Sequence, residues 1–243
     1  MTTLTNTFAR RLHLMLLAGL TALLAGCATG PDANPRDPLE PFNRGMYRFN
    51  DAVDTAVVKP VATAYVEVAP QPVRTGVNNF FSNLRDLWSS VNAALQLRPR
   101  EATENFLRFS VNTFWGIGGL LDIASEMQIE RTTLDFGQTL GRWGVPPGPY
   151  LVLPLMGPST LRDAVGMGVE SSGDLLSGMD HIPSRNTLYA WRVIEARANL
   201  LRAGSLLDQA ALDKYSFTRD AFLQRRESQI RALTGKKDDA DEE

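Results

Sequence analysis

The chain has 243 residues, of which 44% are hydrophobic and 21% are charged, values typical of a folded globular protein and not of a disordered or fibrous one. Its formal net charge is −2, and five acidic residues gather in the last six positions, 238–243. Because there is no basic surplus, the composition argues against a nucleic-acid-binding protein.

The N-terminus has the three regions of a secretory signal peptide. Residues 1–11 carry no acid and end in Arg10-Arg11, an apolar run follows from Leu12 to Leu24, and the small residues Ala25 and Gly26 come next. The run is shorter than the roughly 20 helical residues that a hydrocarbon core requires, which argues against a retained anchor. The sequence therefore predicts a cleaved signal peptide over residues 1–26.

Cys27 directly follows this signal and is the only cysteine of the chain. Residues 24–27, Leu-Ala-Gly-Cys, have the form of a lipobox, at which processing attaches a diacylglycerol and an N-acyl chain to the cysteine. A lone thiol can also be a buried structural residue or a reactive nucleophile, but a thiol at this position has an obvious chemical use. We predict Cys27 as the lipid attachment site and expect no other cofactor. Each buried methylene contributes about 0.8 kcal/mol, so three acyl chains would hold the protein on a membrane permanently. Ala28, in place of Asp, implies sorting to the outer membrane in enteric-type lipoproteins.

The first part of the mature chain predicts a tether and then helices. Residues 27–38 are rich in Gly, Pro, Asp and Asn and show no apolar periodicity, which predicts a tether. From Phe42 to Val57 apolar residues recur at spacings of three and four, which predicts a helix that Pro60 closes. A second helix is predicted from Val77 to Leu95, and a third begins near Thr103, a possible N-cap.

Glycine and proline mark the middle of the chain. Gly116, Gly118 and Gly119 interrupt the third helix and predict either a hinge or a close approach of two backbones. Five prolines and five glycines between residues 136 and 161 exclude a long helix there, although residues 150–155 could form a brief buried strand. This segment is either a rigid irregular loop that closes the fold or merely a surface loop. We favour the first, because irregular backbone within a membrane is tolerated only where it lines a cavity or packs in protein.

Helical periodicity resumes in the last third of the chain. Helices are predicted over residues 162–176, from about 187 to 201 and over 216–233, followed by an acidic, disordered tail at 234–243. No convincing linker divides residues 39–233, so the simplest fold is one mainly α domain with one Pro/Gly-rich irregular segment.

Residue supply argues against an enzyme. The mature chain has a single histidine, His181, and no thiol besides Cys27, so a zinc site lacks ligands. His181 could join Asp174 or Asp180 and a serine in a hydrolytic triad, but no G-x-S-x-G elbow presents the serine. A histidine beside an Asp in a loop more often caps a helix or turn. Glu126, Glu130 and Asp135 carry no specific signal for acid–base chemistry.

The predicted helices are rich in apolar and aromatic residues. Such stripes ordinarily form a protein core. The third helix and residues 151–156, Leu-Val-Leu-Pro-Leu-Met, are however apolar on more than one side. Helices that lie in the interfacial layer of a membrane, or that line an apolar passage, would show the same pattern.

Two long blocks of sequence resemble one known family. DPLEPFNRGMYRFND at residues 37–51, followed by PVATAYVEVAPQPVRTGVNNFFSNL at 60–84, is similar to the MlaA (VacJ) family of outer-membrane lipoproteins. The second block, DFGQTLGRWGVPPGPYLVLPLMGPSTLRD at 135–163, resembles the same family, and the match extends to about residue 230. The acidic extension after Gly235 is a departure from the family pattern.

The resemblance implies a ring-like helical protein on the periplasmic face of the outer membrane, associated with a porin trimer. Such a protein removes misplaced phospholipid from the outer leaflet and passes it to a periplasmic carrier, which maintains lipid asymmetry. A structural lipoprotein that scaffolds envelope or peptidoglycan machinery is the alternative, and it would need no apolar lumen. For transport we predict a route with acyl-chain positions on the first helix, head-group positions beside them, and a gate. The acyl-chain positions are Phe42, Met46 and Phe49, and the head-group positions are Asn43, Arg44 and Asn50. The gate is a hinge at Gly116, Gly118 and Gly119.

Overall fold

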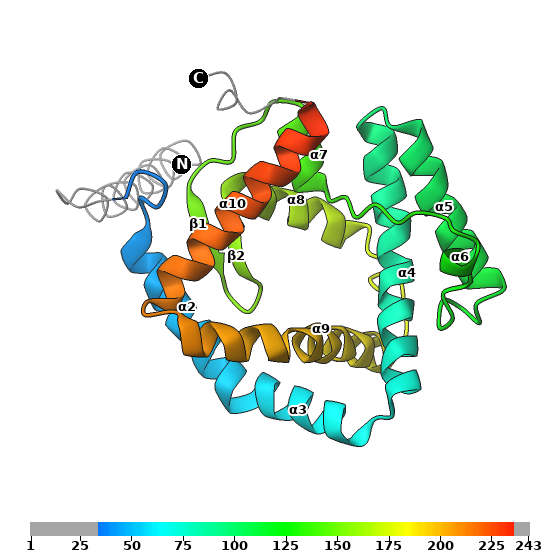
Figure 1. Cartoon of the computed structure of the whole chain (residues 1–243), viewed down its shortest axis with the longest axis horizontal. Helices are drawn as coiled ribbons and strands as arrows, with labels where there is room; N and C mark the ends of the chain where they lie inside the picture. Colours follow the sequence, from blue (N-terminus) through cyan, green and yellow to red (C-terminus); the bar gives the residue numbers. More distant parts are fainter. Residues whose placement is uncertain (1–33, 236–243) are drawn as a thin grey trace, which may run out of the picture.

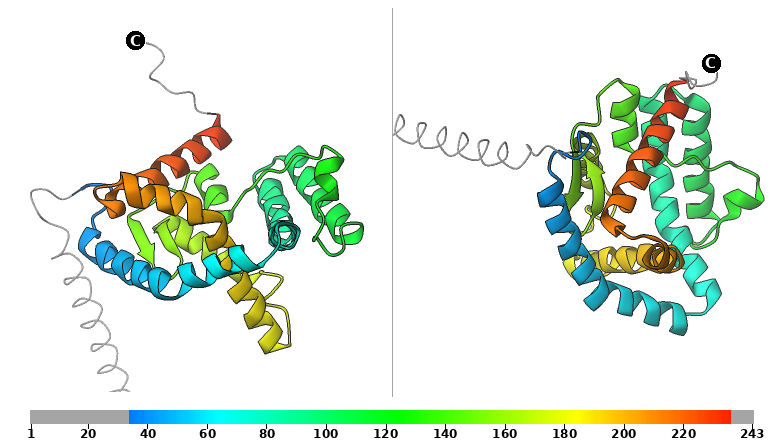
Figure 2. Two further views of the ribbon diagram at one scale, coloured as in Figure 1. Left: turned by 60° about the horizontal axis from the view of Figure 1, so that its bottom comes forward. Right: turned by 60° about the vertical axis from the view of Figure 1, so that its left-hand side comes forward.

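The computed structural model describes residues 34–235 as one mainly helical domain (Figure 1). Its elements follow one another around a ring-like frame, and the hairpin lies between α2 and α10 (Figure 2, right). The elements are α2 (Glu40–Val53), η1 (Asp54–Val58), α3 (Lys59–Val68), α4 (Gln71–Leu95), α5 (Pro99–Phe114), α6 (Ile123–Glu126), α7 (Phe136–Arg142), β1 (Tyr150–Leu153), β2 (Gly157–Thr160), α8 (Leu161–Ser172), α9 (Ile182–Ala210) and α10 (Lys214–Thr234). The mainly α, ring-like, single-domain prediction is confirmed.

One edge of the frame is a continuous run of helix from α2 through η1 to α3. Pro60 was predicted to close the first helix. It lies instead in the first turn of α3. Proline lacks an N–H donor and its ring clashes with the carbonyl four residues earlier. The wider turn of the π-helix η1, placed directly before it, accommodates this break in the hydrogen-bonding pattern.

The helices α4, α5 and α6 form an arm at one side of the frame (Figure 2, left). α4 spans the predicted second helix, whereas α5 starts at Pro99 and not at Thr103. Proline suits the first turn of a helix, because its missing N–H would have no partner there. Thr103 lies inside α5 and its hydroxyl donates to the carbonyl of Pro99 at 2.8 Å.

The Pro/Gly-rich segment contains the only sheet within residues 34–235, an antiparallel hairpin of β1 and β2. Tyr150 pairs with Thr160, and Leu153 pairs with Gly157, so the predicted short strand is confirmed at 150–153. Before it, Asp135 caps α7 in a capping box with Gln138. The side chains of Tyr150 and Val152 are buried, which supports the interpretation of this segment as a packed structural element.

The folded part begins earlier than predicted. Asp37, assigned to the tether, is almost completely buried, and its carboxylate accepts hydrogen bonds from Asn43, Tyr215 and Arg219. These three donors fix the segment before α2 against α10. The predictions for residues 1–33 and 236–243, Cys27 included, lie outside the described residues.

The interior of the molecule is unusually polar. Among the described residues, more polar and charged side chains than apolar ones are buried. α4 turns Asn83, Asp86, Ser89 and Asn92 inward, while Leu95 of the predicted apolar stripe is exposed. The expectation that these stripes form the core holds for Phe81 of α4 and Val111 of α5, which are buried. It is wrong for the exposed members of the stripes, namely Val91, Leu95, Phe106, Leu107 and Phe114.

Large apolar side chains are exposed at the end of the arm. Phe114 is 79% exposed, Trp115 is 70% exposed, and Ile117 follows them in the next turn. Within residues 34–235, no helix combines the length and the hydropathy that a membrane span requires.

Candidate functional site

The polar residues of the predicted route hold α2 against the hairpin. The side-chain amide of Asn43 donates to the carbonyl of Tyr150 at 3.0 Å and accepts from the N–H of Val152 at 2.9 Å. Asn50 repeats this pattern two turns later, with the Leu153 carbonyl and the Leu155 N–H, both at 2.8 Å. Asn43 is completely buried and forms hydrogen bonds with the backbone of the hairpin. The prediction that it faces a head group is therefore wrong.

Arg44 is also engaged by protein groups. Its guanidinium donates to Glu40 at 2.7 Å and to Asp213 at 2.7 Å, and it lies over the ring of Tyr215. The Arg44 guanidinium and the Ser216 hydroxyl hold the pKa of the Asp213 carboxyl well below its usual range. This contact joins α2 to the N-terminal cap of α10, and Arg44 closes the frame at that corner.

The apolar residues of the predicted route are divided between two environments. Met46 packs against the buried cluster of Tyr150 and Tyr215. Phe42 and Phe49 are each about half exposed, and further exposed apolar side chains follow along η1 and α3, namely Val57, Val61 and Val68. This apolar edge, Phe42 to Val68, is available to acyl chains or to another apolar surface.

The predicted hinge is a tight turn. Ile117, Gly118 and Gly119 all have positive φ, and the N–H of Gly119 donates to the Asn112 carbonyl at 2.8 Å. A Cβ on Gly116 would lie 2.3 Å from the Leu121 carbonyl oxygen and 2.4 Å from that of Asn112. The structure thus has both the bend and the close backbone approach, and a gating role stays a prediction.

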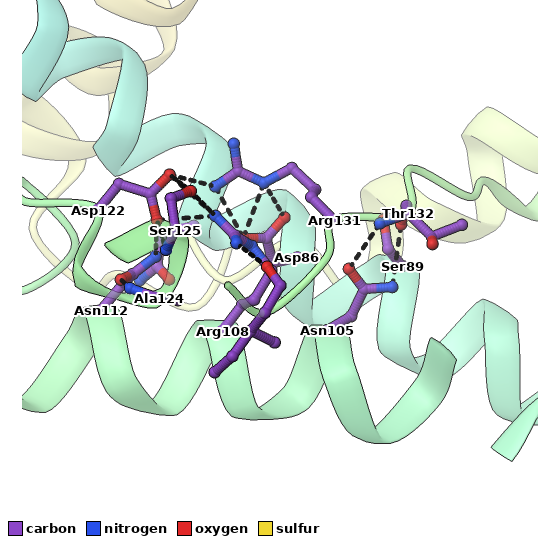
Figure 3. Close-up of polar contacts among 12 residues, drawn as sticks. Asp86, Ser89, Asn105, Arg108, Asn112, Asp122, Ala124, Ser125, Arg131 and Thr132 are labelled. Carbon is purple, nitrogen blue, oxygen red and sulfur yellow. Dashed lines mark hydrogen bonds and ion pairs between the residues drawn. The ribbon is translucent and has the colours of Figure 1, made fainter. Parts of the chain in front are cut away.

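A network of two arginines and two aspartates holds the arm together, and sequence reasoning missed it (Figure 3). The guanidinium of Arg108 on α5 donates to both oxygens of Asp122, at 2.7 and 2.8 Å, and lies 3.5 Å from Asp86 on α4. Arg131 lies on the other side of Asp86, with its Nε 2.9 Å from a carboxylate oxygen. Ser125 completes the set by donating to Asp122 at 2.7 Å.

Burial and charge act in opposite directions on the two carboxyl groups of this arm network. Burial raises the pKa of Asp86, and the neighbouring Arg131 only partly offsets that effect. Burial also acts to raise the pKa of Asp122, but hydrogen bonds from Ser125 and Asn112 and the two guanidinium charges outweigh it and lower that pKa. The network pairs its charges internally, as groups removed from water require.

A second network joins α7, α8 and α10. Arg226 donates to both oxygens of Asp135, at 2.6 and 2.8 Å, and to both oxygens of Asp163, at 2.9 and 2.8 Å. Arg162 donates to Asp163 at 3.1 Å. Gly137 packs directly against this cluster, since a Cβ there would lie 2.4 Å from Asp163. Asp135, which carries no specific sequence signal for acid–base chemistry, is thus an ion-pair partner in this network.

A groove of about 1070 Å³ opens beside this second network, between α10 and the loop that follows α7. Arginines 36, 142, 162, 226 and 231 line it together with apolar side chains such as Leu223 and Ile230. Mixed cationic and apolar lining is compatible with an amphiphile that carries a negative charge.

Among residues 34–235 the single histidine, His181, lies at the start of a helix. His181 caps the N-terminus of α9, where its Nδ1 accepts from the Ser184 N–H at 3.3 Å, as the capping interpretation predicts. The part of the chain that the structure describes contains no group of three or more His, Cys, Asp or Glu residues placed to hold a metal.

Together these features define a class, a single-domain, ring-like helical protein whose interior is rich in polar groups and whose surface carries many exposed apolar side chains. A family model described as MlaA lipoprotein matches residues 35–229. The chain is 42% identical over 221 residues to the intermembrane phospholipid transport system lipoprotein MlaA of Escherichia coli, covering 88% of this chain and 87% of the relative. It is 34% identical over 224 residues to the protein of the same name from Haemophilus influenzae, covering 86% and 87%.

Structure comparison agrees with the sequence comparison. A solved structure from work on the structural basis for maintenance of bacterial outer membrane lipid asymmetry superposes with a TM-score of 0.70 at 38% identity. The match covers 80% of this chain and 98% of the other. The chain belongs to the MlaA lipoprotein family.

Proposed function

We propose that this protein is an outer-membrane lipoprotein that removes mislocalised phospholipid from the outer leaflet and passes it to a periplasmic carrier. The observation that carries the proposal is the match over most of the chain to a lipoprotein named for intermembrane phospholipid transport. The proposed partners are phospholipid, a porin trimer and a periplasmic lipid carrier. The role is transport and not catalysis.

The polarity of the structure supports this function. The two acyl chains of a phospholipid contain roughly 30 methylenes, so exposing them to water would cost on the order of 20 kcal/mol at about 0.8 kcal/mol each. A carrier without its own energy source must therefore shield the chains. The exposed apolar edge from Phe42 to Val68 supplies apolar surface for this shielding along α2, η1 and α3.

The arm supports a position within the membrane. Its apolar side chains face outward at Phe106, Leu107, Phe114 and Trp115, while its buried polar groups bond to one another. In hydrocarbon, polar and charged groups must be satisfied internally, and this arrangement meets that requirement. Lipidation at Cys27 would place the frame at the periplasmic leaflet.

The envelope phenotype of a deletion strain separates transport from the scaffold alternative. Loss of a phospholipid transporter is expected to increase detergent sensitivity, and the wild-type gene should restore resistance. Loss of a scaffold is expected to detach the outer membrane from peptidoglycan without changing its lipid distribution, and that result would contradict our proposal. Phe42→Ala should reduce detergent resistance with little effect on folding, because Phe42 is exposed.

A further inference from the structure

A small polar cavity lies at the corner where α3, α4 and α9 meet, on the opposite part of the frame from the hairpin (Figure 1). Its volume is about 90 Å³. The residues that line it include Tyr65 on α3, Arg74 on α4, and Glu195 and Asn199 on α9. A water molecule needs about 10–15 Å³ of such volume, so the cavity has room for about six to nine water-sized groups.

Two donors in this corner cavity lack hydrogen-bond partners among residues 34–235. They are the hydroxyl of Tyr65 and the Nε of Arg74, and both atoms are buried. Tyr65 is only 9% exposed, and its ring is held edge-on by Trp191 at a centroid distance of 5.2 Å. Buried donors in proteins are normally satisfied, so this unsatisfied pair indicates a place for an acceptor.

The two opposite charges of the cavity are not paired with each other. Glu195 is 4% exposed, and the one hydrogen bond it accepts in the described part of the chain comes from the Asn199 amide, one turn along α9. No basic group of residues 34–235 lies within ion-pair distance of Glu195, and no acidic group lies that close to Arg74. Buried charges are normally paired, so the cavity has a cationic side at Arg74 and an anionic side at Glu195, neither of which has an ion-pair partner among residues 34–235.

The position of Arg74 adds to the cationic side. Arg74 lies in the first turn of α4, a helix of 25 residues, where the helix dipole and the terminal N–H groups favour an anion. The matching ligand is therefore a zwitterion with an anion at Arg74 and Tyr65 and a cation at Glu195. Phosphoethanolamine has this pattern, a phosphate and an ammonium two carbons apart, in eight non-hydrogen atoms.

We propose that this corner cavity binds the phosphoethanolamine head group of a glycerophospholipid, with the phosphate at Arg74 and Tyr65 and the ammonium at Glu195. The proposal rests on the proposed function and names the substrate class for which that function selects. Val68 and Val73 lie beside the corner and are exposed, so they offer apolar surface to the acyl chains outside the cavity.

Binding to the full-length lipidated protein in detergent tests the proposal. The probes are dihexanoyl phosphatidylethanolamine, dihexanoyl phosphatidylglycerol, glycerophosphoethanolamine and inorganic phosphate. Isothermal titration calorimetry gives the affinity. In a variant that keeps Trp191 as its only tryptophan, the fluorescence of this residue, which contacts Tyr65, gives a local signal. We expect phosphatidylethanolamine to bind at least tenfold more tightly than phosphatidylglycerol, and glycerophosphoethanolamine to compete where inorganic phosphate does not.

Variants separate the two ends of the zwitterion. Glu195→Gln should abolish the preference for ethanolamine and leave phosphatidylglycerol binding unchanged. Arg74→Gln should weaken both lipids at least tenfold. The matched controls are Arg85→Gln on α4 and Glu67→Gln on α3, both at exposed positions, and neither should change binding. Thermal unfolding of each variant identifies any that fails to fold, and Tyr65→Phe, which keeps the ring, then replaces Arg74→Gln.

Three results would overturn the proposal. They are an ethanolamine preference that survives in Glu195→Gln, equal affinity for the two lipids in the wild type, and inorganic phosphate that binds as tightly as the lipid. The proposed function fails on a separate measurement, if the wild-type gene does not lower surface phospholipid in a deletion strain. A Glu195→Gln protein that still lowers total surface phospholipid but no longer favours the ethanolamine lipid would support both.

Discussion

Replacement of Arg108 by leucine tests whether the arm depends on its polar interior. Arg108 is 1% exposed and contacts Asp122, Ser125, the Ile129 carbonyl and Asp86. Its loss leaves two carboxylates that share a single guanidinium, that of Arg131, whose second contact, to Asp122, is 3.6 Å long. Breaking a buried ion pair by removing one partner costs about 3–5 kcal/mol. That is a large part of the roughly 5–15 kcal/mol by which a domain is stable.

The assay is thermal unfolding of the lipidated protein in detergent micelles. For a chain of this size the loss corresponds to a fall in Tm of about 6–20 °C. Arg100→Leu on the same helix is the matched control, because the Arg100 side chain is 75% exposed and pairs with Glu104 at the surface. The control should leave the transition unchanged within error. Equal transitions for Arg108→Leu and Arg100→Leu would refute the reasoning.

Four further outcomes follow from the structure. Asn43→Ala leaves hairpin N–H and C=O groups unpaired and should destabilise the protein by about 2–4 kcal/mol, which urea unfolding measures. Gly116→Ala should lower the Tm because its Cβ meets two carbonyl oxygens, whereas Gly45→Ala, which meets nothing within 4 Å, should raise it slightly. The arginine partners of Asp163 outweigh burial and lower its pKa in the folded state, so its stabilisation is complete above about pH 4 and is lost as pH falls further. Asp163→Asn should thus differ from wild type in unfolding free energy at pH 7 and converge with it in acid. In a variant that keeps Trp115 as its only tryptophan, lipids brominated on the acyl chains should quench the fluorescence of this exposed residue. Quenching by aqueous iodide alone would contradict a position of the arm within the membrane.

The helices and the hairpin strand were accessible from sequence because their signals are local. Residues 150–153 form a strand in a segment whose prolines and glycines exclude a helix, and α4 spans the predicted second helix. Pro60 misled the prediction, because a proline ordinarily ends a helix and nothing in the sequence marks the π-turn before it.

The polar contacts were not accessible, because their partners are distant in sequence. Asn43 reaches Val152 across 109 positions, and Arg226 reaches Asp135 across 91. The spacing of Asn105, Arg108 and Asn112 places them on one face of α5, but polar residues at this spacing equally predict a face exposed to water. The assumption that polar residues lie outside failed for this face, because Asn105, Arg108 and Asn112 are all buried.

The most direct test of the central claim is the amount of phospholipid on the surface of intact cells that lack the gene. We expect the deletion to raise this amount, the wild-type gene to return it to the parental level, and Cys27→Ser to restore it poorly although the protein folds. Surface phospholipid that stays at the parental level in the deletion strain would contradict the account.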